Sequence, residues 1–253
     1  IQNAPHLVSN QAFVIPNYSW WDGPFYQLGL KIYDFMSGDL GIGSSKRLSV
    51  EETICHIPTI DQKELAGGVI YFDGQFDDAR MAISLAKTAA QFDGVLLNYM
   101  KVEKIIKNEE GIAEGVMALN LETQEKYQIH SKVVINATGV FADAIKKMDD
   151  SDAREMIQPS QGTHIVLDAS FLPDKYAIMV PRTKDGRVLF AVPWHNKVIV
   201  GTTDTVVEKP LLEPHFQLEE VEFILETASQ YLTKKPTKKD VLSIFSGLRP
   251  LAK

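Results

Sequence analysis

The chain has a single cysteine, Cys55, among its 253 residues. One cysteine excludes an internal disulfide and any C-x-x-C metal or redox motif, and it is consistent with a reducing compartment. We expect the Cys55 side chain to be buried as a packing residue. The sequence also has no apolar run near the roughly 18 residues that a membrane-spanning helix needs, so we predict no transmembrane segment.

Several motifs that mark well-known protein classes are missing as well. There is no H-x-x-x-H, no G-x-S-x-G and no Walker loop, so metallohydrolases, serine hydrolases and P-loop proteins have no support. The 26 Lys and Arg against 33 Asp and Glu give a net charge of −7 without a basic block, which argues against nucleic-acid binding. Redox enzymes and binding proteins remain as candidates.

The glycine motif G-x-G-x-x-G is absent too. In dinucleotide-binding folds this motif forms the turn whose following helix holds the pyrophosphate. The chain begins with Ile1 and not with Met, and it ends at Lys253, just after a strand-like run. We therefore interpret it as the central part of a longer enzyme.

The sequence pattern changes twice, which predicts three segments: 1–65, 66–150 and 151–253. The first alternates short strands with an aromatic helix, for which we favour core packing over membrane insertion. The second has the order of elements typical of an α/β nucleotide-binding domain, and the third reads as a mixed or antiparallel sheet with a covering helix. The elements expected in the two later segments are helices at 77–92 and 218–232 and strands at 95–99, 115–121, 126–129, 133–138, 163–167, 176–180, 188–192, 197–200 and 241–245.

The strand predicted at 133–138 ends in a small-residue turn, Asn136-Ala-Thr-Gly139. Such a turn allows the backbone to approach a flat cofactor closely. An ordinary tight connection between a strand and a helix has the same residues, so the turn alone does not identify a cofactor.

His164 is the first candidate for chemistry. It stands near the start of a predicted strand, directly after the turn Ser160-Gln-Gly-Thr163. An unperturbed histidine has a pKa of about 6.5, so it can accept a proton from a substrate hydroxyl near neutral pH. Taken alone, however, a histidine on a strand is more often a hydrogen-bonded structural residue.

Arg249 is the second candidate. It follows Gly247 at the end of a predicted strand, and Pro250 comes next. A guanidinium offers a fixed fork of donors that suits a phosphate or a carboxylate, although a surface ion pair explains the residue equally well. Gly201-Thr-Thr-Asp204 is a further polar turn, and for it we favour a structural role.

Taken together in sequence order, these and other motifs resemble FAD-dependent glycerol-3-phosphate dehydrogenases. The resemblance extends over almost the whole chain, and the ordered set is more specific than any one motif. Its members are Leu28-Gly-Leu-Lys-Ile-Tyr-Asp34, Asp73-Gly-Gln-Phe-Asp-Asp-Ala-Arg80, Asn136-Ala-Thr-Gly139, Pro159-Ser-Gln-Gly-Thr-His164, Pro193-Trp194, Gly201-Thr-Thr-Asp204 and Ser246-Gly-Leu-Arg-Pro-Leu251.

This resemblance implies an α/β plus α+β fold: part of an FAD-binding domain of the glutathione-reductase-like type, in 66–150, and a mixed or antiparallel-sheet substrate domain. It implies oxidation of sn-glycerol 3-phosphate to dihydroxyacetone phosphate by hydride transfer to FAD, with quinone or oxygen as the electron acceptor. It also implies a cytoplasmic protein at the inner face of a membrane, in peripheral contact with it. His164 matches the family's active-site histidine, Arg249 an arginine that contacts substrate, and Ala137, Thr138 and Gly139 the cofactor-binding turn.

The family's N-terminal glycine-rich fingerprint and its later segments have no counterpart in these 253 residues. We therefore expect the chain alone to bind FAD weakly and not to turn over. Two other functions stay open: a related FAD-dependent enzyme that acts on an amino acid or a 2-hydroxy acid, with Arg249 on its carboxylate, and a non-catalytic binding domain. The central expectation is that His164 and Arg249 converge on one cavity that faces the flavin.

Overall fold

The computed structural model describes residues 3–37, 41–183 and 186–253. The chain forms two compact units, each assembled from segments that are far apart in sequence. Two strands, β7 (Ile157–Asp168) and β12 (Ser243–Ala252), each run from one unit into the other. The first unit comprises Ile1–Met81, Gly162–Asp204 and Glu213–Gly247, and the second comprises Ala82–Gln161, Thr205–Leu212 and Leu248–Lys253.

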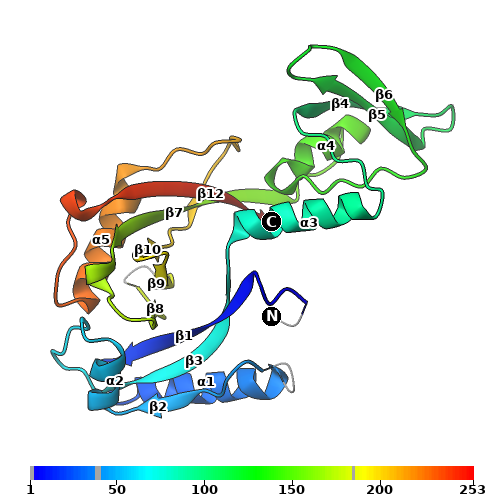
Figure 1. Ribbon diagram of the computed structural model, residues 1–253. Helices are drawn as coiled ribbons and strands as arrows, with labels where there is room; N and C mark the ends of the chain where they lie inside the picture. Colours follow the sequence, from blue (N-terminus) through cyan, green and yellow to red (C-terminus); the bar gives the residue numbers. More distant parts are fainter. Residues whose placement is uncertain (1–2, 38–40, 184–185) are drawn as a thin grey trace. The chain divides into compact units, whose positions relative to one another are not determined.

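A mixed sheet forms the centre of the first unit (Figure 1). Its strands follow the order β7-β10-β9-β8-β1-β3-β2, and β11 and β12 also pair with β7. The pairs β1–β3, β2–β3, β7–β10, β7–β11, β8–β9 and β9–β10 are antiparallel, whereas β1 and β8 run parallel. The remaining strands are β1 (Val8–Asn17), β2 (Lys46–Leu48), β3 (Gly67–Phe76), β8 (Ala177–Val180), β9 (Leu189–Trp194), β10 (Lys197–Gly201) and β11 (Thr205–Val206).

The strands of this sheet place hydrophobic side chains on both of its faces, because successive residues of a strand point to opposite sides. On β1, Val14 contributes to one core, whereas Phe13 and Ile15 contribute to the other. Helices α2 (Val50–His56) and α5 (Leu218–Tyr231) cover the face of Val14. The helical spacing predicted for α5 is confirmed, since its buried apolar residues are Val221, Ile224, Leu225 and Ala228.

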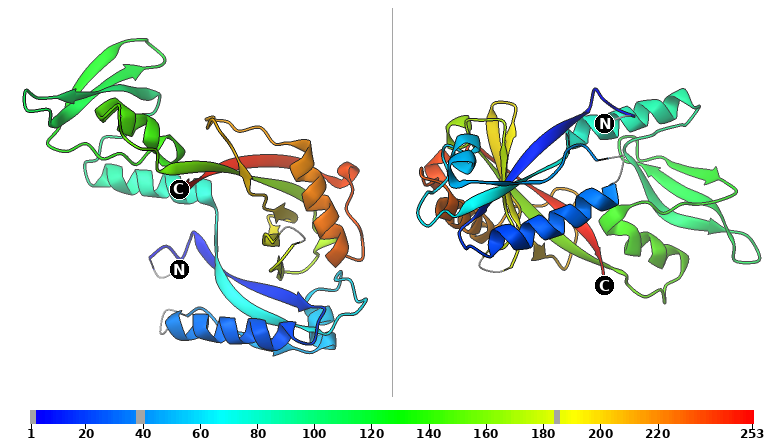
Figure 2. Two further views of the ribbon diagram at one scale, coloured as in Figure 1. Left: turned by 180° about the vertical axis from the view of Figure 1, so that it is seen from behind. Right: turned by 90° about the horizontal axis from the view of Figure 1, so that it is seen from below.

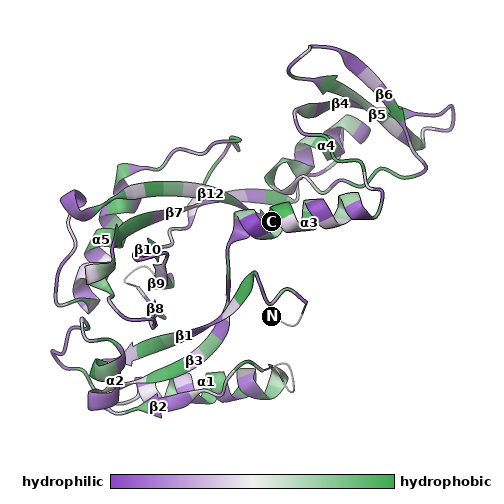
Figure 3. Cartoon of the chain, in the orientation of Figure 1, coloured by the Kyte–Doolittle hydropathy of each residue, from purple (hydrophilic) through white to green (hydrophobic). Residues whose placement is uncertain are grey.

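Helix α1 (Asp22–Ser37) lies beside β3 in the first unit (Figure 2). Tyr26 and Leu30 pack against the core that contains Phe13, but the opposite side of the helix is open, with Phe25 72% and Phe35 86% exposed. Hydrophobic residues recur along α1 (Figure 3), so the expectation of core packing was right for one face of the helix only. The sequence also predicts that this helix stops at Gly38, a residue that lies outside the described part of the chain.

Cys55 is exposed, so the prediction that it is buried was wrong. It lies on α2, where Thr53 is the buried residue. Residues two apart on a helix do not share a face, and the burial of Thr53 therefore turns Cys55 outward.

The second unit contains most of α3 (Asp78–Gln91), a three-stranded antiparallel sheet and helix α4 (Ala142–Asp149). The sheet consists of β4 (Met100–Lys107), β5 (Ala113–Asn120) and β6 (Lys126–His130). The strands predicted at 115–121 and 126–129 are confirmed, and they pair as an antiparallel hairpin. The predicted start of α3 is confirmed too, because the Asp77 carboxylate accepts a hydrogen bond from the Arg80 amide at 3.0 Å. Short 3-10 helices occur at Gly139–Phe141 (η2), Ala169–Phe171 (η3) and Lys238–Asp240 (η4).

The strands predicted at 95–99 and 133–138 are not formed. Neither segment pairs with a strand in the described part of the chain, and their apolar side chains are open, with Val95 85% and Ile135 81% exposed. A strand needs a neighbouring strand to satisfy its backbone groups, so an apolar pattern alone does not make a segment a strand. Among the described helices, none is long and apolar enough to cross a membrane.

Candidate active site

His164 lies on β7, on the face of the sheet opposite to α5. Its neighbours Thr163 and Ile165 are fully buried toward the α5 side, whereas His164 is half-buried and lines a cavity on the other face. The alternation of a β-strand therefore turns the imidazole into the cavity. Directly opposite His164, on the neighbouring strand β10, stands Gly201.

The imidazole of His164 is held by groups from two other strands. The phenyl ring of Phe245, on β12, stacks on it with centroids 5.0 Å apart and an angle of 8° between the planes. On β10, a Cβ added to Gly201 would lie 2.9 Å from Cγ and 3.0 Å from Nε2 of His164, closer than real Cβ atoms approach. The ring therefore occupies the space that a side chain at position 201 would need.

The cavity has a volume of about 490 Å³ and belongs entirely to the first unit. Aromatic rings form much of its wall, and two of them, Phe13 and Tyr71, stack with centroids 5.2 Å apart. Phe190 meets Phe13 edge to face at 5.7 Å. The other lining residues are Asp73, Gly74, Gln75, Phe76, Asp77, Asp78, Ala79, His164, Val192, Trp194, Ile199, Gly201, Thr202 and Phe245.

These walls suit a flat and uncharged ring system. Aromatic faces favour stacked or edge-to-face contacts with another ring. Among the described residues that line the cavity, none is Lys or Arg, and three are aspartates. A phosphate or carboxylate must therefore be met by a cation outside this lining.

Arg249 is half-buried on β12 and belongs to the second unit, whereas His164 belongs to the first. The predicted convergence of these two side chains on one cavity therefore stays a prediction.

The predicted cofactor-binding turn at Ala137, Thr138 and Gly139 is exposed, and hydrogen bonds of the Asn136 and Thr138 side chains stabilise it. The Thr138 hydroxyl donates to the Asn136 side-chain oxygen at 2.8 Å, and the Asn136 amide donates to the Ala142 carbonyl at 2.9 Å. Gly139 has φ +58°, and a Cβ there would meet nothing within 4 Å. Ala137, Thr138 and Gly139 are exposed, and their role in binding the cofactor stays a prediction.

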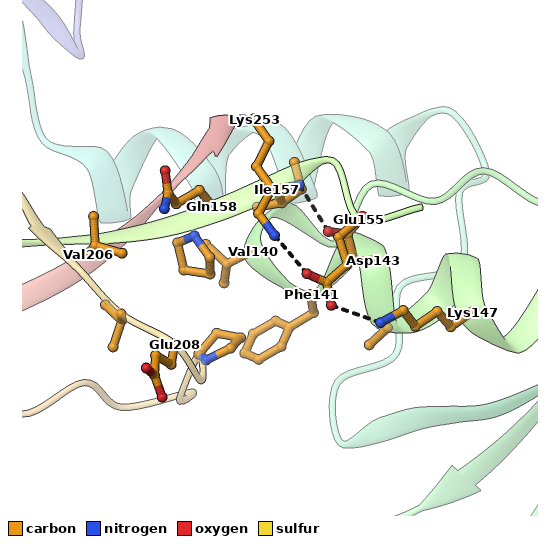
Figure 4. Close-up of a pocket in the computed structure, with 14 residues that line it drawn as sticks. Val140, Phe141, Asp143, Lys147, Glu155, Ile157, Gln158, Val206, Glu208 and Lys253 are labelled. Atoms are coloured by element: carbon orange, nitrogen blue, oxygen red, sulfur yellow. Dashed lines mark hydrogen bonds and ion pairs between the residues drawn. The ribbon is translucent and has the colours of Figure 1, made fainter. Parts of the chain in front are cut away.

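A second cavity, also about 490 Å³, lies within the second unit between α4 and the start of β7 (Figure 4). Glu155 pairs there with Lys147 at 2.8 Å and with Lys253 at 2.7 Å, and these two ammonium groups lower the pKa of its carboxyl to about 2. Asp143 accepts hydrogen bonds from the amides of Met156 and Ile157. Because these charges serve the local structure, we assign no chemistry to this cavity.

Sequence reasoning missed the aromatic wall and the residues that hold the His164 ring. Phe13 and Tyr71 occupy facing positions of β1 and β3, so a correct strand pairing could have brought them together. The structural role favoured for the turn Gly201-Thr-Thr-Asp204 fits its contacts, since the Thr203 hydroxyl accepts a hydrogen bond from the Thr163 amide at 2.9 Å.

The aromatic cavity suits a flat ring system, and comparison with known families identifies the class of protein. A family model described as FAD dependent oxidoreductase matches residues 18–253. The chain therefore belongs to the FAD dependent oxidoreductase family, which confirms the expected fold class and FAD as the cofactor.

Within that family, the relatives are those that the motifs predicted. The chain is 37% identical to "Glycerol-3-phosphate dehydrogenase, mitochondrial" of Schizosaccharomyces pombe, over 100% of its own length and 40% of the relative's. It is also 37% identical to the human protein of the same name, over 99% of its own length and 35% of the relative's. The predicted resemblance is confirmed, and the chain spans well under half the length of these relatives.

Solved structures show the same relationship. The glycerol-3-phosphate dehydrogenase from Bacillus halodurans, complexed with FAD, superposes with a TM-score of 0.83 at 31% identity, over 99% of this chain and 46% of that one. The glycine oxidase from Geobacillus kaustophilus has a TM-score of 0.72 at 16% identity, over 100% of this chain and 63% of that one. This second likeness shows a shared fold.

Proposed function

We propose that the chain is part of a flavin-dependent glycerol-3-phosphate dehydrogenase that oxidises sn-glycerol 3-phosphate to dihydroxyacetone phosphate. The observation that carries the proposal is the position of the His164 imidazole, which stacks on Phe245 and lines the aromatic cavity. The relatives of known name support the choice of substrate.

In this proposal His164 acts as the base. When hydride leaves C2 of the substrate, the C2 hydroxyl becomes acidic, and a neutral imidazole within hydrogen-bond reach takes its proton. Arg249 binds the anionic end of the substrate or stabilises the developing negative charge on oxygen, because its guanidinium presents a fixed fork of donors. The described residues that line the cavity include three aspartates and no Lys or Arg, so they do not offer a cationic contact to the substrate.

Bound FAD supplies the hydride acceptor. The aromatic cavity fits its flat ring system, and the open backbone around Gly139 fits a second contact, for which we propose Ala137, Thr138 and Gly139. We further propose that 66–150 contributes to the FAD-binding domain, and that 1–65 and 151–253 contribute to the substrate side.

The electron acceptor is proposed to be a quinone or oxygen, and the protein to contact a membrane peripherally. The curated relatives cited above are named as mitochondrial proteins, so the expected cytoplasmic location has no support from them. A peripheral location stays a prediction, and salt extraction of the intact protein from membranes tests it.

The function is tested in the intact protein loaded with FAD, by following the loss of flavin absorbance after anaerobic mixing with substrate. We expect reduction by sn-glycerol 3-phosphate and little by glycine or lactate, which carry a carboxylate in place of the phosphate. His164→Asn should slow reduction by about 10²- to 10⁴-fold, the usual contribution of a general base, with flavin still bound.

Arg249→Met should mainly raise KM for the phosphate substrate, because it removes a binding contact. Preferential reduction by a carboxylate substrate would overturn the assignment in favour of an amino-acid or 2-hydroxy-acid enzyme. Flavin-loaded His164→Asn and Arg249→Met proteins with normal kcat/KM would instead support a non-catalytic domain.

A further inference from the structure

Glu220 is a buried carboxylate that the proposed chemistry does not use. It lies in the first turn of α5, beneath the sheet and on the face opposite to His164, and is only 5% exposed. A buried charge is costly unless it is hydrogen-bonded, so the partners of Glu220 indicate what retains it there.

Two threonine hydroxyls bind this carboxylate. Thr163 donates to Oε2 of Glu220 at 2.7 Å, and Thr203 donates to Oε1 at 2.8 Å. The backbone amide of Gln217 donates to Oε2 at 3.0 Å. Both threonines are themselves almost fully buried, so each hydroxyl depends on the carboxylate as an acceptor.

The same network continues across the sheet. Thr203 accepts a hydrogen bond from the Thr163 amide at 2.9 Å, and the hydroxyls of Thr163 and Ser246 lie 2.8 Å apart. Because Thr163 gives its one hydroxyl proton to Glu220, Ser246 must be the donor in that pair. Because Glu220 accepts from the hydroxyls of Thr163 and Thr203, it determines which hydroxyl group donates in each hydrogen bond of the network.

Each hydroxyl residue of this network is close in sequence to His164 or to a residue that contacts its ring. Thr163 precedes His164 on β7, Ser246 follows Phe245 on β12, and Thr203 comes two residues after Gly201. The network therefore connects β7, β12 and the segment that follows β10, next to the residues that contact the imidazole.

We infer that Glu220 is a positioning residue for His164, acting through Thr163, Thr203 and Ser246. The inference rests on the proposed function, because it requires His164 to be the base. A carboxylate is needed since it accepts from both threonines at once, whereas a glutamine amide offers one acceptor and turns a donor toward the other hydroxyl.

The test is Glu220→Gln in the intact, FAD-loaded protein, with sn-glycerol 3-phosphate as substrate. A misplacement of the base by a fraction of an ångström should lower the rate of flavin reduction by about 10- to 100-fold. KM and flavin content should stay within about twofold, because neither depends on the base. Glu219→Gln is the matched control: this exposed glutamate stands one position earlier, and its variant should behave as wild type.

A double-mutant cycle separates positioning from general support of the fold. If Glu220 acts through His164, then His164→Asn/Glu220→Gln reduces flavin no more slowly than His164→Asn alone. Multiplied effects of the two substitutions, or an unchanged rate in Glu220→Gln, would overturn the inference. A normal rate in His164→Asn overturns the proposed function instead, so the two failures are distinguishable.

A second pair of variants covers the case in which Glu220→Gln does not fold. Thr203→Val keeps the shape of the side chain and removes the hydroxyl, whereas Thr203→Ser keeps the hydroxyl. We expect Thr203→Val to lose about tenfold in rate and Thr203→Ser to lose clearly less. Equal rates in both variants would contradict the inference.

Discussion

The imidazole of His164 and the phenyl ring of Phe245 lie face to face, with planes only 8° from parallel. Phe245 is 46% exposed, so it is not a residue of the buried core. A stacked pair contributes about 0.5–1.5 kcal/mol beyond area burial, and its main effect here is on the orientation of the imidazole. The imidazole of the proposed base is therefore aligned by Phe245, whose side chain has no acidic or basic group.

Loss of this stack should affect rate more than stability. We expect Phe245→Ala to slow flavin reduction by up to about tenfold, the rate equivalent of the stacking energy, with a small change in unfolding temperature. Phe245→Tyr keeps the ring and should retain most of the rate. Stopped-flow flavin reduction with thermal unfolding checks both, and equal rates in the two variants would count against the alignment role.

Gly201 should tolerate no side chain. Because a Cβ at this position would lie 2.9 Å from Cγ of His164, Gly201→Ala must displace the imidazole from the wall of the cavity. We expect a fall in the reduction rate of about 10²-fold, the scale of a displacement near 1 Å.

The matched control for Gly201→Ala is Gly247→Ala. Gly247 lies two residues beyond Phe245, and a Cβ there would meet nothing within 4 Å. The control should fold and bind flavin as wild type does. An equal loss of rate in both variants would show that the effect is not specific to the space occupied by His164.

The sequence predicted those parts of the structure that depend on local periodicity. The apolar spacing of α5 and the hairpin of β5 and β6 both belong to short stretches of chain. The motif around His164 is also local, so the sequence alone could single this residue out as a candidate. Phe245 and Glu220 were missed because their contacts depend on pairings between distant strands, as in the 83-residue separation of Thr163 and Ser246.

The wrong predictions have a common physical cause. The apolar runs at 95–99 and 133–138 predict burial, but burial requires a partner, and periodicity does not say whether one is near. The same holds for α1, where the pattern is apolar nearly all round and the structure covers only the side of Tyr26 and Leu30. The hydrophobic pattern shows which side chains a segment can bury, but the neighbouring elements determine which of them are buried.

Gly29 offers a stabilising substitution on α1. It lies in the interior of the helix, and a Cβ there would meet nothing within 4 Å. Gly29→Ala should raise the free energy of unfolding by about 0.5–1 kcal/mol, because alanine loses less backbone entropy than glycine in a helix. Denaturant unfolding checks this, and a lower midpoint would indicate that the surface around Gly29 is covered by another part of the protein.

The carboxyl of Glu155 should make stability depend on pH in the acid range. Its pKa is lowered from about 4.5 to about 2, first by the hydrogen bond from Lys147 and then by that from Lys253. A carboxyl with a lowered folded-state pKa stabilises the protein above its unfolded pKa, and this contribution is lost as the pH falls through the folded value. The stabilisation from Glu155 should therefore be complete above about pH 4.5, decline from there and vanish below about pH 2.

Thermal unfolding of wild type and Glu155→Gln between pH 2 and pH 7 measures this contribution. The difference in unfolding temperature should be small, because the group is exposed, and it should shrink in high salt. Glu109→Gln, at an exposed turn between β4 and β5, is the control and should leave the acid profile unchanged. A difference between wild type and Glu155→Gln that stays constant down to pH 2 would show that the two lysines do not stabilise the carboxylate in solution.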